Sequence, residues 1–188
     1  MTDTAHQISA RLETCFARQG FAEPGVDTVR EAAGVSLRTL YKYFPSREDM
    51  VIGALEHRHR RYLDHLTAGL PDGPGPAPLH HLTDRVAAWM MDEASTGCLF
   101  LSALAAHPDS DAIRKTVARH KSEIRDALVG FADRAAPDEG ADRRRAIANA
   151  LFLMHEGQVA ATATCGAKTA AEAARQLAAT LLIEKVMQ

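Results

Sequence analysis

Cysteine, aromatic residues and long apolar runs are all scarce in this chain, and each scarcity excludes a class of protein. Three cysteines occur, far apart, so neither a disulfide framework nor a Cys/His zinc motif is present. Aromatic residues make up 5% of the 188 residues, while alanine is abundant, a composition that favours helices over strands. No apolar run is long enough to span a bilayer.

The chain also lacks a strong net charge and the pattern of an export signal. Its formal net charge is -2, and residues 1–65 contain as many acidic as basic side chains. Any affinity for a polyanion must therefore come from a local patch, presented twice if two copies pair. Residues 1–4 have no basic segment followed by an apolar core, so we expect no signal peptide and a cytoplasmic location.

Motifs of the common catalytic and metal-binding classes are absent as well. There is no glycine-rich phosphate loop and no Gly-x-Ser-x-Gly turn. His155 and Glu156 are adjacent on a predicted helix but have no matching nucleophile in the sequence. His57 and His59 point in different directions on a helix, and His65 lies two turns away from His57, so we do not expect them to converge as metal ligands. We expect neither enzymatic activity nor a cofactor or metal.

The most informative stretch is residues 34–45, which predicts a tight turn followed by a short helix. Gly34 suits the turn, Ser36 can cap the helix, and Pro45 stops it. An apolar stripe at helical spacing is predicted to face the core: Leu37, Leu40, Tyr41 and Phe44. The opposite face has two cations, two hydroxyl groups and no carboxylate: Arg38, Thr39, Lys42 and Tyr43.

A basic face without carboxylates suits the major groove of DNA. Arginine can pair with guanine, a hydroxyl group can reach a base edge or a phosphate, and lysine neutralises phosphate. The alternative is an ordinary surface helix with a solvated basic face. The turn, the cap, the proline stop and the acid-free face together favour the DNA-binding interpretation.

The same stretch resembles the DNA-binding motif of the tetracycline-repressor (TetR) family, whose pattern is roughly A-G-V-S-x-x-T-L-Y-x-Y-F-x-S-[KR]-E-x-[LM]. This chain has Ala33-Gly34-Val35-Ser36, then Thr39-Leu40-Tyr41, Tyr43-Phe44, Ser46-Arg47-Glu48 and Met50. The resemblance implies an all-α fold of about nine helices. An N-terminal three-helix helix-turn-helix domain would precede a C-terminal helical domain for ligand binding and dimerisation.

The domain boundaries follow from this resemblance and from composition. We expect the DNA-binding domain in residues 1–50 and the ligand-binding and dimerisation domain in 51–188, with a connecting helix over about 46–68. Residues 70–78, rich in proline and glycine, predict a loop. The last two helices are expected over about 141–164 and 168–187, and the resemblance implies that they form the interface of a homodimer.

Helix phase and the resemblance together predict the DNA contacts. Arg38 or Thr39 should contact bases, whereas phosphates are contacted mainly by Tyr41, Lys42, Tyr43, Ser46 and Arg47. The helix over 26–33 departs from the family pattern, because Pro24-Gly25 stands where threonines are usual. Val26 is expected to face inward there, and Asp27 or Thr28 to cap the helix. The predicted DNA-binding residues are Arg30, Ser36, Leu37, Arg38, Thr39, Tyr41, Lys42, Tyr43, Ser46 and Arg47.

A mainly apolar ligand pocket is expected in the C-terminal domain, with His120 or His155 as the polar partner. No lysine or arginine is among the candidates, so we expect an uncharged or weakly anionic hydrophobic effector. The predicted lining residues are Trp89, Met90, Cys98, Leu101, Leu104, His120, Phe131, Phe152 and His155.

The sequence thus predicts a ligand-responsive repressor that a small hydrophobic effector releases from a palindromic DNA operator. Two alternatives remain open. One is a redox or electrophile sensor that acts through Cys98, which would need an exposed, activated thiol, although no cation is adjacent to it in the sequence. The other is a helical small-molecule-binding protein without a DNA function.

Overall fold

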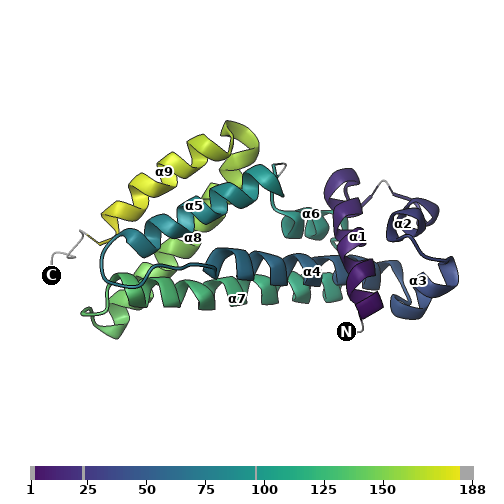
Figure 1. The fold of residues 1–188 in the computed structure, drawn as a ribbon, viewed down its shortest axis with the longest axis horizontal. Helices are drawn as coiled ribbons and strands as arrows, with labels where there is room; N and C mark the ends of the chain where they lie inside the picture. The colour runs from purple at the N-terminus through teal and green to yellow at the C-terminus, as the bar shows by residue number, and fades with distance from the viewer. Residues whose placement is uncertain (1–2, 23, 96, 183–188) are drawn as a thin grey trace. The chain divides into compact units, whose positions relative to one another are not determined.

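The computed structural model describes residues 3–22, 24–95 and 97–182, and that part of the chain contains nine helices and no strand. The all-α prediction is therefore confirmed. The helices, shown in Figure 1, are α1 (Asp3–Gln19), α2 (Val26–Ala33), α3 (Leu37–Tyr43), α4 (Arg47–Thr67), α5 (Ala77–Asp92), α6 (Leu99–Ala106), α7 (Asp111–Ala135), α8 (Ala141–Cys165) and α9 (Ala167–Thr180). None of the helices in these residues combines the length and apolar character of a membrane span.

The last helix is shorter than predicted. α9 ends at Thr180, whereas the sequence indicated a helix to Met187, which lies outside the described residues. Leu181 and Leu182 both pack against the core as partly buried side chains. Successive residues of a helix point in different directions, so a turn after Thr180 lets both leucines reach the core.

Two compact units make up the chain, and each combines two separate segments. Unit 1 consists of Met1–Arg61 and Leu99–His120, and unit 2 of Tyr62–Cys98 and Lys121–Gln188. Unit 1 therefore contains α1 to α3, the first part of α4, α6 and the start of α7. The division into working domains at residue 50 stays a prediction, because compactness alone does not test it.

The core of unit 1 begins on α1, where Ile8, Leu12 and Phe16 are buried at helical spacing. The Phe16 ring stacks on the Phe21 ring, with 5.0 Å between centroids. In α2 the prediction is wrong for Val26, which is 41% exposed. Val26 is the first residue of that helix, and neighbouring helices cover helix ends least.

The cap predicted for α2 is also wrong. The N-cap of α2 is Gly25, and no side chain makes a capping hydrogen bond there, so neither Asp27 nor Thr28 has the predicted role. Both residues lie inside the helix, two and three positions past the cap. Only the residue at the cap has the extended backbone that lets a side chain reach back to the free N–H groups.

Unit 2 has the larger apolar core, built mainly from α5, α7 and α8. Apolar residues at helical spacing on these helices are buried, including Leu82, Val86, Ile124, Leu128 and Leu151. α9 lies along α5 and α8 (Figure 1) and adds small side chains to this core, among them Ala174 and Ala178. Alanine on the buried edge allows the helix axes to approach closely.

Candidate functional site

The turn between α2 and α3 requires glycine at position 34. Gly34 has φ of 66°, in the left-handed region, and its N–H donates to the carbonyls of Arg30 and Glu31 at 3.1 and 3.0 Å. The Arg11 guanidinium donates to the Ala33 carbonyl at 3.0 Å. A Cβ atom at Gly34 would meet the Arg11 Nη1, so a larger residue would displace the Arg11 side chain in addition to straining the backbone.

The start of α3 is capped as the sequence predicted. The Ser36 Oγ accepts a hydrogen bond from the Thr39 N–H at 3.1 Å. The two hydroxyl groups of Ser36 and Thr39 also lie 2.8 Å apart in a hydrogen bond. The cap fixes the direction in which α3 begins, and it occupies the Thr39 hydroxyl.

The apolar stripe predicted for α3 is only half correct. Leu40 is buried within α3, and Phe44 is buried directly after it, but Leu37 and Tyr41 are each 41% exposed. A helix of seven residues packs on its unit along a single edge, so apolar residues beside that edge stay exposed. Leu37 and Tyr41 are therefore accessible next to the basic face.

The basic face of α3 is not neutralised within the described part of the chain. Arg38 and Lys42 are exposed, and neither pairs with a carboxylate among the described residues. The Lys42 ammonium lies 5.5 Å from the centroid of the half-buried Tyr43 ring. The tip of α3 therefore presents two positive charges that are available to an anion.

The end of α3 rests on α4 through a contact that the sequence did not reveal. A Cβ atom at Gly53, in the middle of α4, would lie 2.4 Å from the ring of Phe44. The absence of a side chain at Gly53 thus makes room for the aromatic ring that ends α3. At the start of α4, the Ser46 and Asp49 side chains cap each other's backbone N–H at 3.0 Å in both directions.

Arg47 and Arg30, both predicted to bind DNA, have partners within their own unit. The Arg47 guanidinium donates to the Phe21 carbonyl at 2.6 Å. Arg30 pairs with Glu31 at 3.2 Å and lies 3.9 Å from Asp27. Their roles at DNA stay predictions, and each already has a structural function.

A buried carboxylate joins α1 to α4 in unit 1. Glu13 is 2% exposed, and we call its group with His57, Arg58 and Arg61 the Glu13 cluster. The Arg58 Nε and the Arg61 Nη1 lie 2.7 and 2.9 Å from the Glu13 Oε1, and the His57 Nδ1 contacts the Glu13 Oε2. From the sequence, the histidines of α4 were assessed only as metal ligands, and this cluster was not predicted. Among the described residues no group of three or more His, Cys, Asp or Glu could hold a metal ion.

The predicted ligand-lining residues are divided between the two units. Trp89, Met90 and Phe131 are buried in the core of unit 2, where Cys98 and Phe152 are partly buried against it. In unit 1, Leu101 is 46% exposed, and Leu104 is half-buried. His120, also in unit 1, is buried under the stacked ring of Phe100, and its Nδ1 lies 2.9 Å from the Nδ1 of His59. A pocket that these residues share stays a prediction.

A chain of hydrogen bonds crosses the core of unit 2. The Tyr62 hydroxyl lies 2.6 Å from the His155 Nε2, and the His155 Nδ1 lies 3.0 Å from the Glu156 Oε1. The Lys121 ammonium donates to both oxygens of Glu156 at 2.8 and 2.7 Å. Burial raises the pKa of the Tyr62 phenol well above its ordinary value, so the hydroxyl stays neutral and donates to His155.

Glu156 is held in its charged form. Burial raises the pKa of this carboxyl, but the hydrogen bonds from His155 and Lys121 and the Lys121 charge outweigh burial and lower it from 4.5 to about 2. The Lys121 ammonium also lies 3.8 Å from the Cys98 sulfur. No cation is adjacent to Cys98 in the sequence, but helix packing brings the distant Lys121 close to its sulfur.

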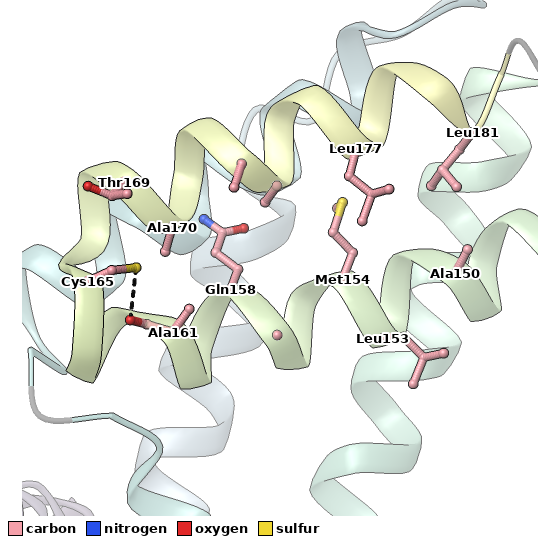
Figure 2. A pocket seen from close by; sticks show the side chains of 13 residues that line it. Ala150, Leu153, Met154, Gln158, Ala161, Cys165, Thr169, Ala170, Leu177 and Leu181 are labelled. Atoms are coloured by element: carbon pink, nitrogen blue, oxygen red, sulfur yellow. Dashed lines mark hydrogen bonds between the residues drawn. The ribbon is translucent and has the colours of Figure 1, made fainter.

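A groove of about 520 Å³ runs along the surface between α8 and α9 (Figure 2). We call it the α8/α9 groove. Its lining contains no charged residue, and beside small alanines it exposes Leu153 and Leu177, which are 71% and 52% exposed. Apolar exposure of this extent marks an interaction surface more often than a free one.

The N-terminal part of the chain is similar in sequence to known proteins. The family described as bacterial regulatory proteins, tetR family, matches residues 10–54, which cover most of α1 and all of α2 and α3. The HTH-type transcriptional regulator LuxR of Vibrio harveyi is 40% identical over 52 residues, 28% of this chain and 25% of that protein. The chain thus matches about a quarter of the length of that relative.

Solved structures resemble the chain over nearly its whole length. A TetR-family transcriptional regulator from Streptomyces coelicolor, SCO4454, has a TM-score of 0.77 at 21% identity, covering 94% of this chain and 95% of that one. GusR from Salmonella enterica has a TM-score of 0.71 at 22% identity, covering 98% and 99%. Residues 10–54 thus match the tetR-family model, and the chain as a whole shares the fold of TetR-family structures.

Proposed function

We propose that this chain is a ligand-responsive transcriptional repressor that binds DNA as a homodimer through α3. The observation that carries the proposal is the exposed tip of α3, with Arg38 and Lys42 free of carboxylate partners among the described residues. The Ser36 cap and the contact of Phe44 with Gly53 hold that helix at both ends. A rigid helix with an uncompensated basic face is what major-groove binding requires.

In this proposal each copy inserts α3 into a major groove, and the two α3 helices lie roughly 34–36 Å apart on a palindromic operator. Arg38 is the better base reader of the two candidates, because the Thr39 hydroxyl already bonds to Ser36. Arginine pairs with guanine through two parallel hydrogen bonds. Lys42, with the hydroxyl groups of Tyr41, Tyr43 and Ser46 and with Leu37 and Arg47, contacts the phosphates and the groove wall.

The homodimer forms through α8 and α9. The α8/α9 groove carries no charge, so identical surfaces can meet around a two-fold axis without repulsion. Exposed Leu153 and Leu177 supply apolar area on both copies. Two copies double the number of phosphate contacts, which compensates for the small net charge of each chain.

A small hydrophobic effector in the C-terminal part would release the operator by favouring a dimer state that no longer fits DNA. The Lys121 charge does not alter the expected effector class, because Glu156 neutralises it at 2.7 Å. We assign His155 as the polar group that orients the effector, since it lies in the core of unit 2 beside the Tyr62 hydroxyl. Such a regulator works in the cytoplasm, where the DNA is.

The test uses the DNA upstream of the protein's own gene and fluorescence anisotropy at several salt concentrations. We expect salt-dependent binding and a loss of about 1–3 kcal/mol at one base position for Arg38→Ala. Arg145→Ala, which removes an exposed positive charge from α8, is the matched control and should bind like the unmodified chain. Wild-type affinity in Arg38→Ala would refute the base-reading role, and the absence of any DNA binding would favour a small-molecule-binding protein without a DNA function.

The second candidate is a regulator that senses electrophiles through Cys98, and Lys121 favours it. A cation close to sulfur is a feature of reactive cysteines, and the Lys121 Nζ is 3.8 Å from the Cys98 Sγ. The sulfur would form a bond to the β-carbon of an activated alkene, while the α-carbon takes a proton from water. Treatment with N-ethylmaleimide should then release DNA from the unmodified chain and from Cys165→Ser, but not from Cys98→Ser. Equal release in both variants would exclude this route.

A further inference from the structure

One buried acceptor in unit 2 has no partner. Gln158 on α8 is 3% exposed, and its Nε2 donates to the Thr83 carbonyl at 2.8 Å. A carbonyl can only accept, so the amide nitrogen must face Thr83, and this fixes the orientation of the amide. The Gln158 Oε1 is then the buried atom that makes no hydrogen bond in the described part of the chain. Leaving such an acceptor unpaired is costly.

Gln158 lines the α8/α9 groove, where its side chain rises from α8 toward α9 (Figure 2). The groove is otherwise nearly free of polar side chains, and the remaining two belong to Cys165 and Thr169. The Cys165 thiol donates to the Ala161 carbonyl at 3.2 Å, so it is engaged within its own helix. The exposed Thr169 hydroxyl has no hydrogen bond among the described residues.

The groove thus contains one acceptor and one donor that do not meet within a single copy. In a two-fold interface every contact between two different residues occurs twice, once in each direction. A donor and an acceptor on the same face can therefore satisfy each other in pairs when two identical faces meet. This is self-complementarity of hydrogen bonding on a surface that is otherwise apolar.

We propose that Gln158 and Thr169 pair across the two-fold axis of the homodimer, with the Thr169 hydroxyl of each copy donating to the Gln158 Oε1 of the other. The inference rests on the homodimer proposed above and names residues that fix its register. A shifted arrangement of the helices would leave the buried Oε1 unpaired, and apolar contacts alone would not penalise that shift. The same requirement disfavours a foreign helix pair that lacks a donor at this place.

The test measures the dimer dissociation constant by sedimentation velocity for four variants. Thr169→Val removes the donor with little change of shape, and Gln158→Met removes the acceptor. Each should raise the dissociation constant by roughly tenfold or more, because two equivalent bonds are lost and a buried partner stays unpaired. The double variant should dimerise better than either single variant, since no unpaired group remains. Thr169→Ser keeps the hydroxyl and should dimerise like the unmodified chain.

Thr164→Val is the matched control, because Thr164 is exposed at the end of α8, and its hydroxyl donates to the Ala161 carbonyl within the helix. It should leave the dissociation constant unchanged. Wild-type dimerisation of Thr169→Val, or losses that simply multiply in the double variant, would overturn the pairing while the dimer itself stands. A wild-type chain that stays monomeric at micromolar concentration would overturn the dimer as well. Thr169 is exposed, so melting of the variants separates a folding defect from an interface defect.

Discussion

The Glu13 cluster in unit 1 and the α8/α9 groove in unit 2 treat polar groups in opposite ways. In the Glu13 cluster a buried carboxylate finds its partners within the same chain, and His57, Arg58 and Arg61 each lie within contact distance of Glu13. In the groove no charge is present, two leucines are exposed, and a buried acceptor stays unpaired within one copy. The carboxylate of the Glu13 cluster is thus paired within a single chain, whereas the buried acceptor in the groove is not.

This difference indicates what each region is for. A buried ion pair tolerates only a narrow range of geometries, so the Glu13 cluster fixes α1 against α4 and thereby the frame around α3. An uncharged face with exposed leucines has few interactions of its own to lose and gains from burial against a copy. On the proposed function, α3 needs a fixed position to bind DNA, whereas the groove needs a second chain.

Placing a charge in the groove should have the largest effect. Leu177→Glu puts two like charges near each other in the dimer and removes apolar area, at a cost of several kcal/mol, so we expect the dissociation constant to rise at least about a thousandfold. Leu177 is 52% exposed, so the monomer should still fold. The control is Gln176→Glu, which adds the same charge at the neighbouring exposed position. A Leu177→Glu dimer as tight as this control in light scattering would exclude the groove as the interface.

Removing the buried carboxylate should destabilise unit 1. Glu13→Ala leaves the cations of Arg58 and Arg61 without their shared counter-charge, which should cost about 3–5 kcal/mol in the free energy of unfolding. Urea unfolding followed by circular dichroism measures this loss. Glu31→Ala is the control, because the Glu31 side chain is 72% exposed and its pair with Arg30 should contribute less than about 1 kcal/mol. Equal losses in both variants would mean that the cluster does not hold α1.

Acid should weaken unit 2 through Glu156. The pKa of this carboxyl is about 2 in the folded chain against 4.5 ordinarily, so the folded state binds this proton less readily than the unfolded chain does. The stabilising contribution is therefore complete above pH 4.5 and is lost as the pH falls toward 2. We expect a smaller effect than at Glu13, because solvent reaches Glu156. Glu156→Gln should flatten the acid limb of unfolding free energy against pH, and an unchanged slope would contradict the assignment.

Residue periodicity predicted the parts of this fold that depend on one helix at a time. Buried positions such as Leu82 and Leu128 follow from spacing, because the apolar side of a long helix must face a core. The same pattern failed for Leu37, Tyr41 and Val26, which are 41% exposed. Periodicity identifies the apolar side of a helix but not whether a neighbour covers it, and short helices or helix ends are covered least.

Contacts between distant segments lay beyond the sequence. Lys121 approaches Cys98 only because α7 packs beside the segment before α6. Glu13 appeared as one polar residue among others on α1, although it follows the buried Leu12 and is itself buried. Glycine lowers helix stability, so helix propensity gives no reason for Gly53 in α4, and its value lies in a contact with Phe44. Each of these depends on a partner that local patterns do not specify.

Filling the space at Gly53 should disturb the contact between the end of α3 and α4, with a smaller effect than the substitutions above. Gly53→Ala forces the Phe44 ring to move, which should cost about 1–3 kcal/mol and weaken DNA binding. Gly130→Ala is a sharp control, because a Cβ there would meet only Arg134 Nη1 at 3.6 Å, an ordinary contact. That variant should gain stability, by about 0.5–1 kcal/mol, from better helix propensity. If thermal unfolding shows Gly53→Ala to be stabilised as well, the Phe44 contact does not restrain α3.

The smallest effect is expected for Lys42→Ala, and it separates the two regions most directly. Lys42 is exposed on α3, so its loss should leave folding and dimerisation unchanged. One phosphate contact fewer per copy should weaken binding to all DNA sequences alike and lower the dependence of log affinity on log salt by about one unit per contact. Leu177→Glu should instead weaken binding by removing the second copy, and high protein concentration should restore part of it. Anisotropy titrations at several salt and protein concentrations distinguish the two variants. A Lys42→Ala chain with an unaltered salt slope would show that this lysine does not touch phosphate, and the basic face of α3 would then have to act through Arg38 alone.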